Sequence, residues 1–438
     1  MNLARWWRRS AANVDPPVVA GAATGVLGSP WRAVVRPWGD VHPKDGSSPL
    51  RWFVAADDRW HHPDREAAVR QRLVDGVPVI ETRMRVPRGD VVQTVWSTTV
   101  GDVGATVIDV SNESALPVAV ALTRTDLITF RPTTSSEEWP APGLDLPNRP
   151  LVVPIGHRSS ARVVLRHDGR VDSLPAELPD VESVMRGWSA VVDRGGRLVV
   201  PDLLDGVPLG ERVTSARCQA ILLGDHAESA AERLLDLDER VRANVEVADP
   251  VFVVGRIEEM LDDMRRGRLD HTTARLAVTA ASRLFGDDER ARADLVAAVA
   301  RVRGCRADDM CAAWGDVEPV TSLAVSRHVL PALVHDRLAR LTARDTVTLL
   351  PDGMPNDWLG VSCEAHGIAV GDRHTVSFAV RWHGERPAVL WEIDGPAGFV
   401  LRSGVDPSWS SSDVRGEALW TAPSRPKTSL AVSDQSFS

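Results

Sequence analysis

The segment from Asn356 to Glu392 holds the most closely spaced side chains that could do acid–base chemistry. Glu364 and His366 are two residues apart, so on a β-strand they would lie on one face, with Cα atoms about 7 Å apart. A carboxyl group and an imidazole placed in this way could share a proton or bind one sugar hydroxyl. An ordinary polar pair on a solvent-exposed face is the alternative. The nearby candidate substrate-binding residues are Trp358, Arg381 and His383.

A second candidate group lies in CRADDMCAAWGD, residues 305–316. Asp308 and Asp309 join Glu364 as candidate catalytic carboxyl groups, because glycoside hydrolysis needs an acid and a base, about 6.5–9.5 Å apart when the reaction inverts. Trp314 follows closely, and the apolar face of a pyranose stacks on an indole ring. The alternative is that both aspartates occupy the N-cap and first turn of a helix, where negative charge is favourable.

Composition and motifs argue against phosphate-binding, serine-hydrolase and metal-dependent chemistry. Neither of the two lysines, Lys44 and Lys427, lies in a phosphate-binding Gly-rich loop, and no serine-hydrolase or zinc-protease motif occurs. His61 and His62 are adjacent, so on a strand they would point to opposite faces and make a poor metal site. We therefore expect neither a cofactor nor a metal.

The arginines do not indicate a nucleic-acid partner. Lysine and arginine together number 51, but the net charge is −9 and no basic stripe occurs, whereas phosphate-binding proteins usually concentrate positive charge. The chain has no tyrosine, and its richness in Ala, Val, Arg, Asp and Gly is typical of a GC-rich genome. We expect no nucleic-acid partner.

The location is predicted to be cytoplasmic. Arg8-Arg9 could begin a twin-arginine signal, but Asp15 and Pro16-Pro17 interrupt the apolar segment that such a signal needs. No run approaches the roughly 18 apolar residues of a membrane span. Four scattered cysteines fit free thiols in a reducing compartment.

The elements that must position these residues fall into three zones. Residues 1–200 alternate short β-branched runs with Gly, Pro and Asp, which predicts an antiparallel β-sandwich. Residues 205–345 show helical periodicity with Asp starts and Gly ends, as in DPVFVVGRIEEMLDDMRRG (249–267), and predict helical hairpins, with a bend near Pro331. Residues 346–425 return to strand alternation, and 426–438 form a polar tail expected to be disordered. The fold class predicted is a multi-domain α+β protein.

Two runs carry a resemblance to a known family. VVQTVWSTT with ATVIDVSNESALPVAVALTRTDL is similar to supersandwich strands, and the WLG…CEAHG…VSFAVRWHGERPAVLWE segment resembles β segments of bacterial glucoamylase-like proteins. The layout resembles that of the six-hairpin glycosidases, in which a supersandwich packs against an (α/α)₆ toroid. That resemblance implies carbohydrate metabolism and paired-carboxylate catalysis on an oligosaccharide.

The helical zone departs from this family in length. Twelve helices of about 11 residues with short connections need roughly 180–200 residues, and the zone offers only about 140. We therefore expect an incomplete toroid. Two functions stay open: a glycoside hydrolase, or a non-catalytic scaffold that binds a glycan or a protein. The oligomeric state cannot be predicted.

Overall fold

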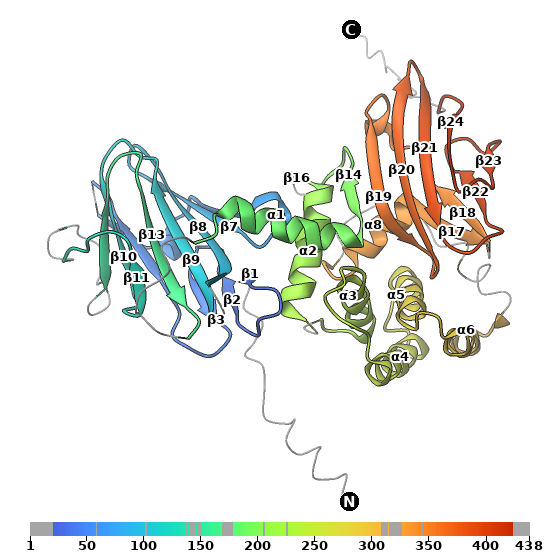
Figure 1. Cartoon of the computed structure of the whole chain (residues 1–438), viewed down its shortest axis with the longest axis horizontal. Helices are drawn as coiled ribbons and strands as arrows, with labels where there is room; N and C mark the ends of the chain where they lie inside the picture. The colour runs from blue at the N-terminus through green and yellow to red at the C-terminus, as the bar shows by residue number, and fades with distance from the viewer. Residues whose placement is uncertain are drawn as a thin grey trace, which may run out of the picture. The chain divides into compact units, whose positions relative to one another are not determined.

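The chain is an α+β protein that divides into two compact units (Figure 1). The computed structural model describes residues 21–57, 59–100, 103–135, 139, 146, 150–168, 178–204, 206–224, 227–307, 314, 326–343 and 345–423. Unit 1 comprises Met1–Ala190 and Ile221–Leu223, and unit 2 comprises Val191–Ala220 and Gly224–Ser438. The helical region and the C-terminal β segment, predicted as two domains, thus belong to one unit. The predicted disordered tail lies outside the described residues.

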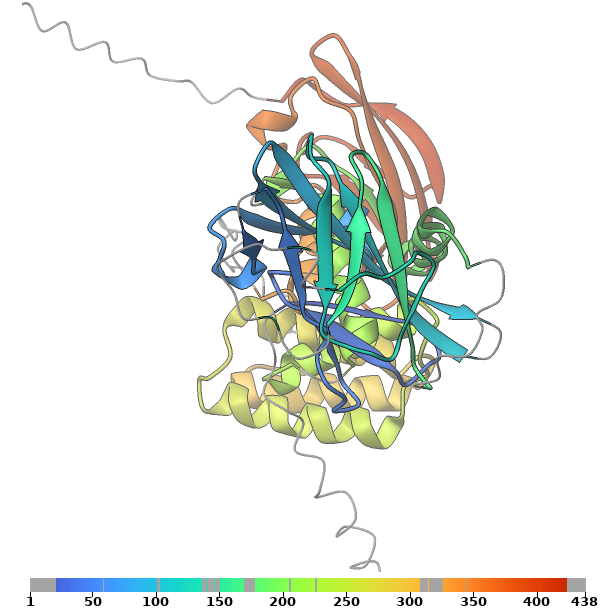
Figure 2. The ribbon, with the colours of Figure 1, turned by 90° about the vertical axis from the view of Figure 1, so that its left-hand side faces the viewer.

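Unit 1 is built from antiparallel sheets (Figures 1 and 2). Their strand orders are β1-β2-β3, β12-β10-β4-β5 and β11-β13-β9-β8-β7-β6. The strands are β1 (Ala22–Gly25), β2 (Arg32–Val35), β3 (Val41–Pro43), β4 (Trp52–Ala55), β5 (Trp60–His61), β6 (Val69–Leu73), β7 (Ile80–Val86), β8 (Gly89–Val100), β9 (Val103–Asn112), β10 (Val118–Leu122), β11 (Leu127–Thr129), β12 (Leu151–Ile155) and β13 (Ser160–Arg166). Short 3₁₀ turns lie at Pro63–Arg65 and Val74–Gly76.

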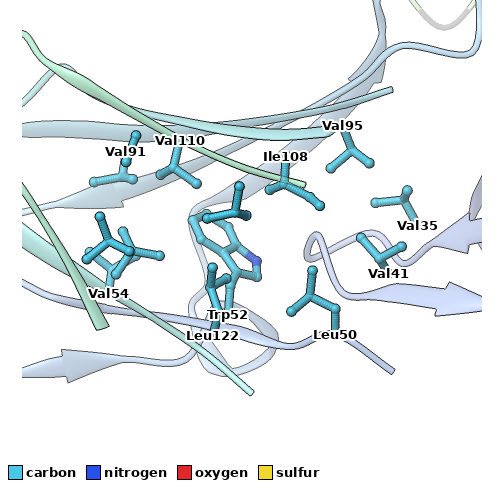
Figure 3. Packing of buried hydrophobic residues seen from close by; sticks show 14 of the residues in the cluster. Val35, Val41, Leu50, Trp52, Val54, Val91, Val95, Ile108, Val110 and Leu122 are labelled. Carbon is cyan, nitrogen blue, oxygen red and sulfur yellow. The ribbon is translucent and has the colours of Figure 1, made fainter. Parts of the chain in front are cut away.

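The core of unit 1 forms because apolar side chains alternate along these strands. Trp52 and Leu122 from one sheet and Ile108 and Val95 from another join one fully buried cluster (Figure 3). Nε1, the only polar atom of the Trp52 side chain, has a hydrogen-bond partner, because it donates to the carbonyl oxygen of Trp38 at 2.8 Å.

Helix α1 (Val181–Val192) falls in the stretch 1–200 that was predicted to be entirely β. Val184, Trp188 and Val192 recur at helical spacing, and the buried ones are Trp188 and Val192. The Asp180 side chain caps the helix by accepting from the Ser183 backbone N–H at 2.7 Å. The helical spacing of these apolar residues is visible in the sequence. It covers only one short helix, however, and follows a long series of strands.

The helices of unit 2 start and stop where the sequence marks them. They are α2 (Leu209–Leu223, which ends in unit 1), α3 (Ala230–Arg242), α4 (Pro250–Arg265), α5 (His271–Leu284), α6 (Glu289–Arg303) and α8 (Leu330–Leu338). Asp249, Asp270 and Asp288 cap α4, α5 and α6 with their side chains. Gly304 ends α6 in the left-handed conformation, with φ of 70°. The boundaries predicted from the segment 249–267 are confirmed to within two residues by α4.

The end of the helical zone differs from the prediction. Pro331 does not bend a helix; it lies in the first turn of α8, where a missing N–H removes no hydrogen bond. The stretch from Ala339, predicted to be helical, is instead strand β17 (Ala339–Ala343), paired with β18 (Thr346–Leu349). Pairing between strands outweighs the helical propensity of Leu, Ala and Arg here.

The rest of unit 2 is a sheet in the order β14-β19-β20-β21-β24, a sheet in the order β17-β18-β22-β23, and the ribbon β15-β16. The remaining elements are β14 (Arg197–Val199), β15 (Leu203–Leu204), β16 (Val207–Pro208), β19 (Cys363–Val370), β20 (His374–His383), β21 (Arg386–Asp394), β22 (Val400–Ser403), β23 (Ser410–Ser411), β24 (Arg415–Leu419) and the 3₁₀ turns Asp193–Gly195 and Asn356–Trp358. Strand β20 buries His374, Val376, Phe378 and Val380, as its alternation predicts, while Trp382 is half-buried.

Candidate functional site

Glu364 and His366 lie on β19, on the solvent-exposed side of the C-terminal sheet. His366 Nε2 contacts Glu364 Oε2 at 2.9 Å, and Arg381 of β20 donates to Glu364 Oε1. The side chains of His366 and Arg381 are 47% and 46% exposed. The hydrogen bond from Arg381 and then that from His366 lower the pKa of Glu364 to about 2. A carboxyl group held ionised in this way is the opposite of a general acid, whose pKa must be raised.

The other predicted residues are dispersed. Trp358 is 3% exposed in the core of unit 2, and its Nε1 donates to Asp202 Oδ1 at 2.6 Å. His383 is exposed at the end of β20. Asp308 and Asp309 lie outside the described residues. Trp314 is described, and it lines a cavity of about 300 Å³ within unit 2.

This cavity, here named the arginine pocket, lies among α3, α5, α6, α8, β17 and β19. Its polar lining comes mainly from one face of α5 and from α8 with the start of β17. The lining residues with polar or charged side chains are Arg242, Thr272, Arg275, Thr279, Ser282, Arg283, His335, Asp336, Arg337, Arg340, Thr342 and Asp372.

A buried ion-pair cluster supports one side of the pocket. Arg217 Nε on α2 donates to Glu239 Oε2 on α3 at 2.6 Å, and Arg242 Nη1 donates to the other oxygen of that carboxylate at 2.8 Å. Burial alone would raise the pKa of Glu239, but Arg217 and Arg242 outweigh it, so the pKa is lowered. Arg283 Nη2 binds Asp238 Oδ2 at 2.6 Å.

Asp336 on α8 is held by two arginines. Both of its oxygens accept from Arg275, at 2.5 and 2.7 Å, and Oδ2 also accepts from Arg340 Nε at 2.9 Å. Arg340 in turn pairs with Asp352, with Nη2 and Oδ2 3.2 Å apart. A carboxylate bound by two guanidinium groups is a strongly fixed anion.

His335 is buried next to these arginines and is neutral. Burial, and then the charges of Arg242, Arg217 and Arg283, lower its pKa well below the usual value. Arg217 Nη2 donates to His335 Nε2 at 2.7 Å, so the proton of the neutral ring is on Nδ1.

Arg337 differs from the other arginines of the lining. It is half-buried in the last turn of α8, and it makes no ion pair or hydrogen bond with any residue that the structure describes. Trp314 stands at the same pocket, with Arg303 4.1 Å from its ring centroid and His271 packed edge-on. The pocket thus combines an indole ring, hydroxyl groups and a guanidinium, that of Arg337, which has no partner among the described residues.

Most of the pocket was not foreseen from the sequence. The available signal was the stretch LLDLDERVR in α3, where charged residues occur at buried positions among leucines; these are Asp236, Asp238, Glu239 and Arg240. Charged side chains are rarely buried without partners. This pattern therefore predicts buried ion pairs. The high arginine content of the whole chain makes this local pattern hard to recognise in the sequence.

In the described part of the chain, no three His, Cys, Asp or Glu side chains come together as metal ligands would. His61 and His62 contact different carboxylates, Glu66 and Asp64. Cys218 and Cys363 are buried free thiols.

No protein-family model and no curated protein matches this chain. The resemblance to six-hairpin glycosidases therefore stays a prediction. Within the described ranges, no helix has the length and apolar character needed to cross a membrane.

Proposed function

We propose that this chain binds a small carbohydrate in the arginine pocket and does not hydrolyse it. Of the two functions that the sequence leaves open, this is the non-catalytic, glycan-binding one. The observation that carries the proposal is the position of Trp314 at a cavity that also holds hydroxyl and charged side chains. A cavity of about 300 Å³ is at the small end of ligand pockets and suits one or two sugar rings.

The lining has the groups that a sugar needs. An indole offers a flat apolar surface for the C–H face of a pyranose. Arg303 covers one face of the Trp314 ring, so stacking would use the other face or the ring edge. Thr272, Ser282 and Asp372 supply groups that can exchange hydrogen bonds with sugar hydroxyls.

The state of the carboxylates favours binding over hydrolysis. A glycosidase needs a carboxyl group that is protonated before the reaction. Among the described residues of the pocket lining, Asp336 is occupied by Arg275 and Arg340, and Asp372 accepts from Ser282. Glu364 lies outside the lining, and its pKa is lowered to about 2.

The proposal includes the finer architecture suggested by the resemblance. Unit 1 would be a supersandwich-like β-sandwich, and the hairpins of α3 to α6 would be an incomplete α/α toroid. Contacts of α3 with α4 and α5, and of α4 and α5 with α6, support the second part. A cytoplasmic location, supported by the buried thiols of Cys218 and Cys363, completes the proposal.

Thermal unfolding in the presence of sugars tests this function. The panel contains glucose, maltose, glucuronate and glucose 6-phosphate. A ligand at about 100 times its Kd stabilises by roughly 2.7 kcal/mol, which raises the Tm of a unit of this size by about 5–10 °C. We expect W314A to abolish the shift and W382A, on β20 outside the lining, to keep it.

Two results would count against the proposal. If no sugar in the panel shifts the Tm of the wild-type chain, the pocket is not a carbohydrate site. If the chain releases reducing sugar from maltose or longer gluco-oligosaccharides, and W314A does not, the claim that it only binds is wrong.

A further inference from the structure

We propose that two copies of this chain associate through strand β24, each copy adding its β24 to that of the other in antiparallel orientation. The two C-terminal sheets would then form one continuous sheet, with Gly416 on the two-fold axis. This inference is independent of sugar binding. Three observations carry it: the open edge of β24, the order of its charged residues, and the glycine between them.

Strand β24 is the last strand of the sheet β14-β19-β20-β21-β24, and among the described strands it pairs only with β21 (Figure 1). The carbonyl oxygen of Val414 accepts from β21 at 2.8 Å, and the N–H of Trp420 donates to β21 at 2.9 Å. Backbone groups alternate in direction along an antiparallel strand. The N–H and C=O groups of Arg415 and Glu417 therefore point away from β21, to the outer edge of the sheet.

This edge is open to solvent. In the strand Arg415–Leu419 every residue except Ala418 is exposed, and Leu419 is 46% exposed. At the opposite edge of the sheet, the start of α2 lies against β14, since a Cβ atom at Gly210 would be 2.5 Å from the carbonyl oxygen of Leu198. An open edge strand is a template for pairing with another strand.

The charges of β24 are complementary to those of a second copy. In an antiparallel pair centred on Gly416, Arg415 faces Glu417 of the second copy, and Glu417 faces Arg415 of the second copy. An interface with two-fold symmetry repeats each contact in this way. Opposite charges that face each other across two strands stabilise the pairing. The facing residues are also those whose backbone groups point outward, so each facing pair can exchange both N–H···O bonds.

Other centres of symmetry are less favourable. A pair centred on Arg415 or on Glu417 would place two like charges opposite each other, which destabilises strand pairing. Gly416 already has a role within the sheet, because a Cβ atom there would lie 2.6 Å from Cζ2 of Trp391. The same glycine leaves the axis without a side chain, so the two backbones can approach closely.

Charged residues on an edge strand can instead guard it against association. In that case Arg415 and Glu417 would keep the chain monomeric, and reversing one of the charges would leave the oligomeric state unchanged. The two interpretations therefore differ both in the oligomeric state and in its response to charge reversal.

Sedimentation velocity of the full chain at loading concentrations from about 1 to 200 µM measures this association. We expect a reversible dimer in this range, because an interface confined to one edge strand is small. R415E and E417R each place like charges opposite each other in both facing pairs, so each should weaken the dimer at least about tenfold. R197E changes an exposed arginine of β14, at the other edge of the same sheet, and should dimerise as the wild type does.

An equimolar mixture of R415E and E417R gives the sharpest readout. In the mixed dimer each facing pair again joins a carboxylate and a guanidinium, so the mixture should dimerise although each variant alone is largely monomeric. This recovery also shows that both variants are folded.

Three results would overturn the proposal. A wild-type chain that stays monomeric at every concentration would show that the edge is guarded. Single variants that dimerise as the wild type does would place the contact on another surface. A mixture that stays as monomeric as its components would exclude the pairing of Arg415 with Glu417.

Discussion

Arg217 and Glu239 are among the most deeply buried charged side chains that the structure describes. Their side chains are 2% and 4% exposed, and Arg217 also donates to the carbonyl oxygens of Gly195 and Gly196. A buried charge is tolerated because its partners are in place, so removing one partner leaves the other unsatisfied.

R217M should therefore destabilise unit 2 strongly. We expect a loss of about 3 kcal/mol or more in the free energy of unfolding, since Glu239 keeps only Arg242. Urea unfolding followed by circular dichroism measures it. The matched control is R72Q, which breaks the exposed pair between Arg72 and Glu81 and should cost less than about 1 kcal/mol. Equal losses in the two variants would show that the buried cluster is not a special source of stability.

Glu364 gives a pH-dependent prediction on the protein surface. Its pKa is lowered in the folded chain from 4.5 to about 2, first by Arg381 and then by His366. A lowered folded-state pKa stabilises the fold above pH 4.5, and this contribution is lost as the pH falls from about 4.5 to about 2. Carboxyl NMR titration should show the low pKa, and R381Q should raise it more than H366Q does. A wild-type pKa near 4.5 would contradict the contacts described for β19 and β20.

At the scale of elements, α3 supports one side of the pocket, because its Arg242 lines the cavity and its Asp238 and Glu239 make the ion pairs behind that lining. Its start is fixed by a capping box: the Ser229 hydroxyl accepts from the Glu232 N–H at 3.2 Å, and the Glu232 side chain accepts from the Ser229 N–H at 3.4 Å. The position of this helix therefore depends on a short polar motif.

Replacing Ser229 tests that dependence. S229A should lower the free energy of unfolding by about 1 kcal/mol, and S229N, which can still cap, should lose much less. Chemical denaturation of the two variants gives both numbers. If S229A and S229N lower the free energy of unfolding by the same amount, the side-chain cap does not stabilise the start of α3.

The elements also show what the sequence can and cannot predict. Helix α4 follows from Asp249, Pro250 and an apolar stripe, and β20 follows from alternation, because both patterns are local. β17 does not follow, because its partner β18 decides its conformation. The pocket was missed for a similar reason: Arg275 on α5 meets Asp336 on α8 only after folding, and no spacing in the sequence records that contact.

At the scale of the whole molecule, each unit has its own hydrophobic core. Among the described residues, one cluster around Trp52 and Ile108 and a smaller one around Phe53 and Trp60 are formed only by unit 1, and two further clusters are formed only by unit 2. The arginine pocket is likewise lined only by residues of unit 2. Separate cores favour two unfolding transitions, of which a pocket ligand should affect only one.

Differential scanning calorimetry of the full chain with saturating glucose, maltose, glucuronate or glucose 6-phosphate tests the central claim most directly. The transition that R217M lowers belongs to unit 2. We predict that at least one of these sugars raises this transition and leaves the other unchanged, and that W314A removes the effect. A unit 2 transition that none of these sugars moves, or a shift confined to the other transition, would contradict the account.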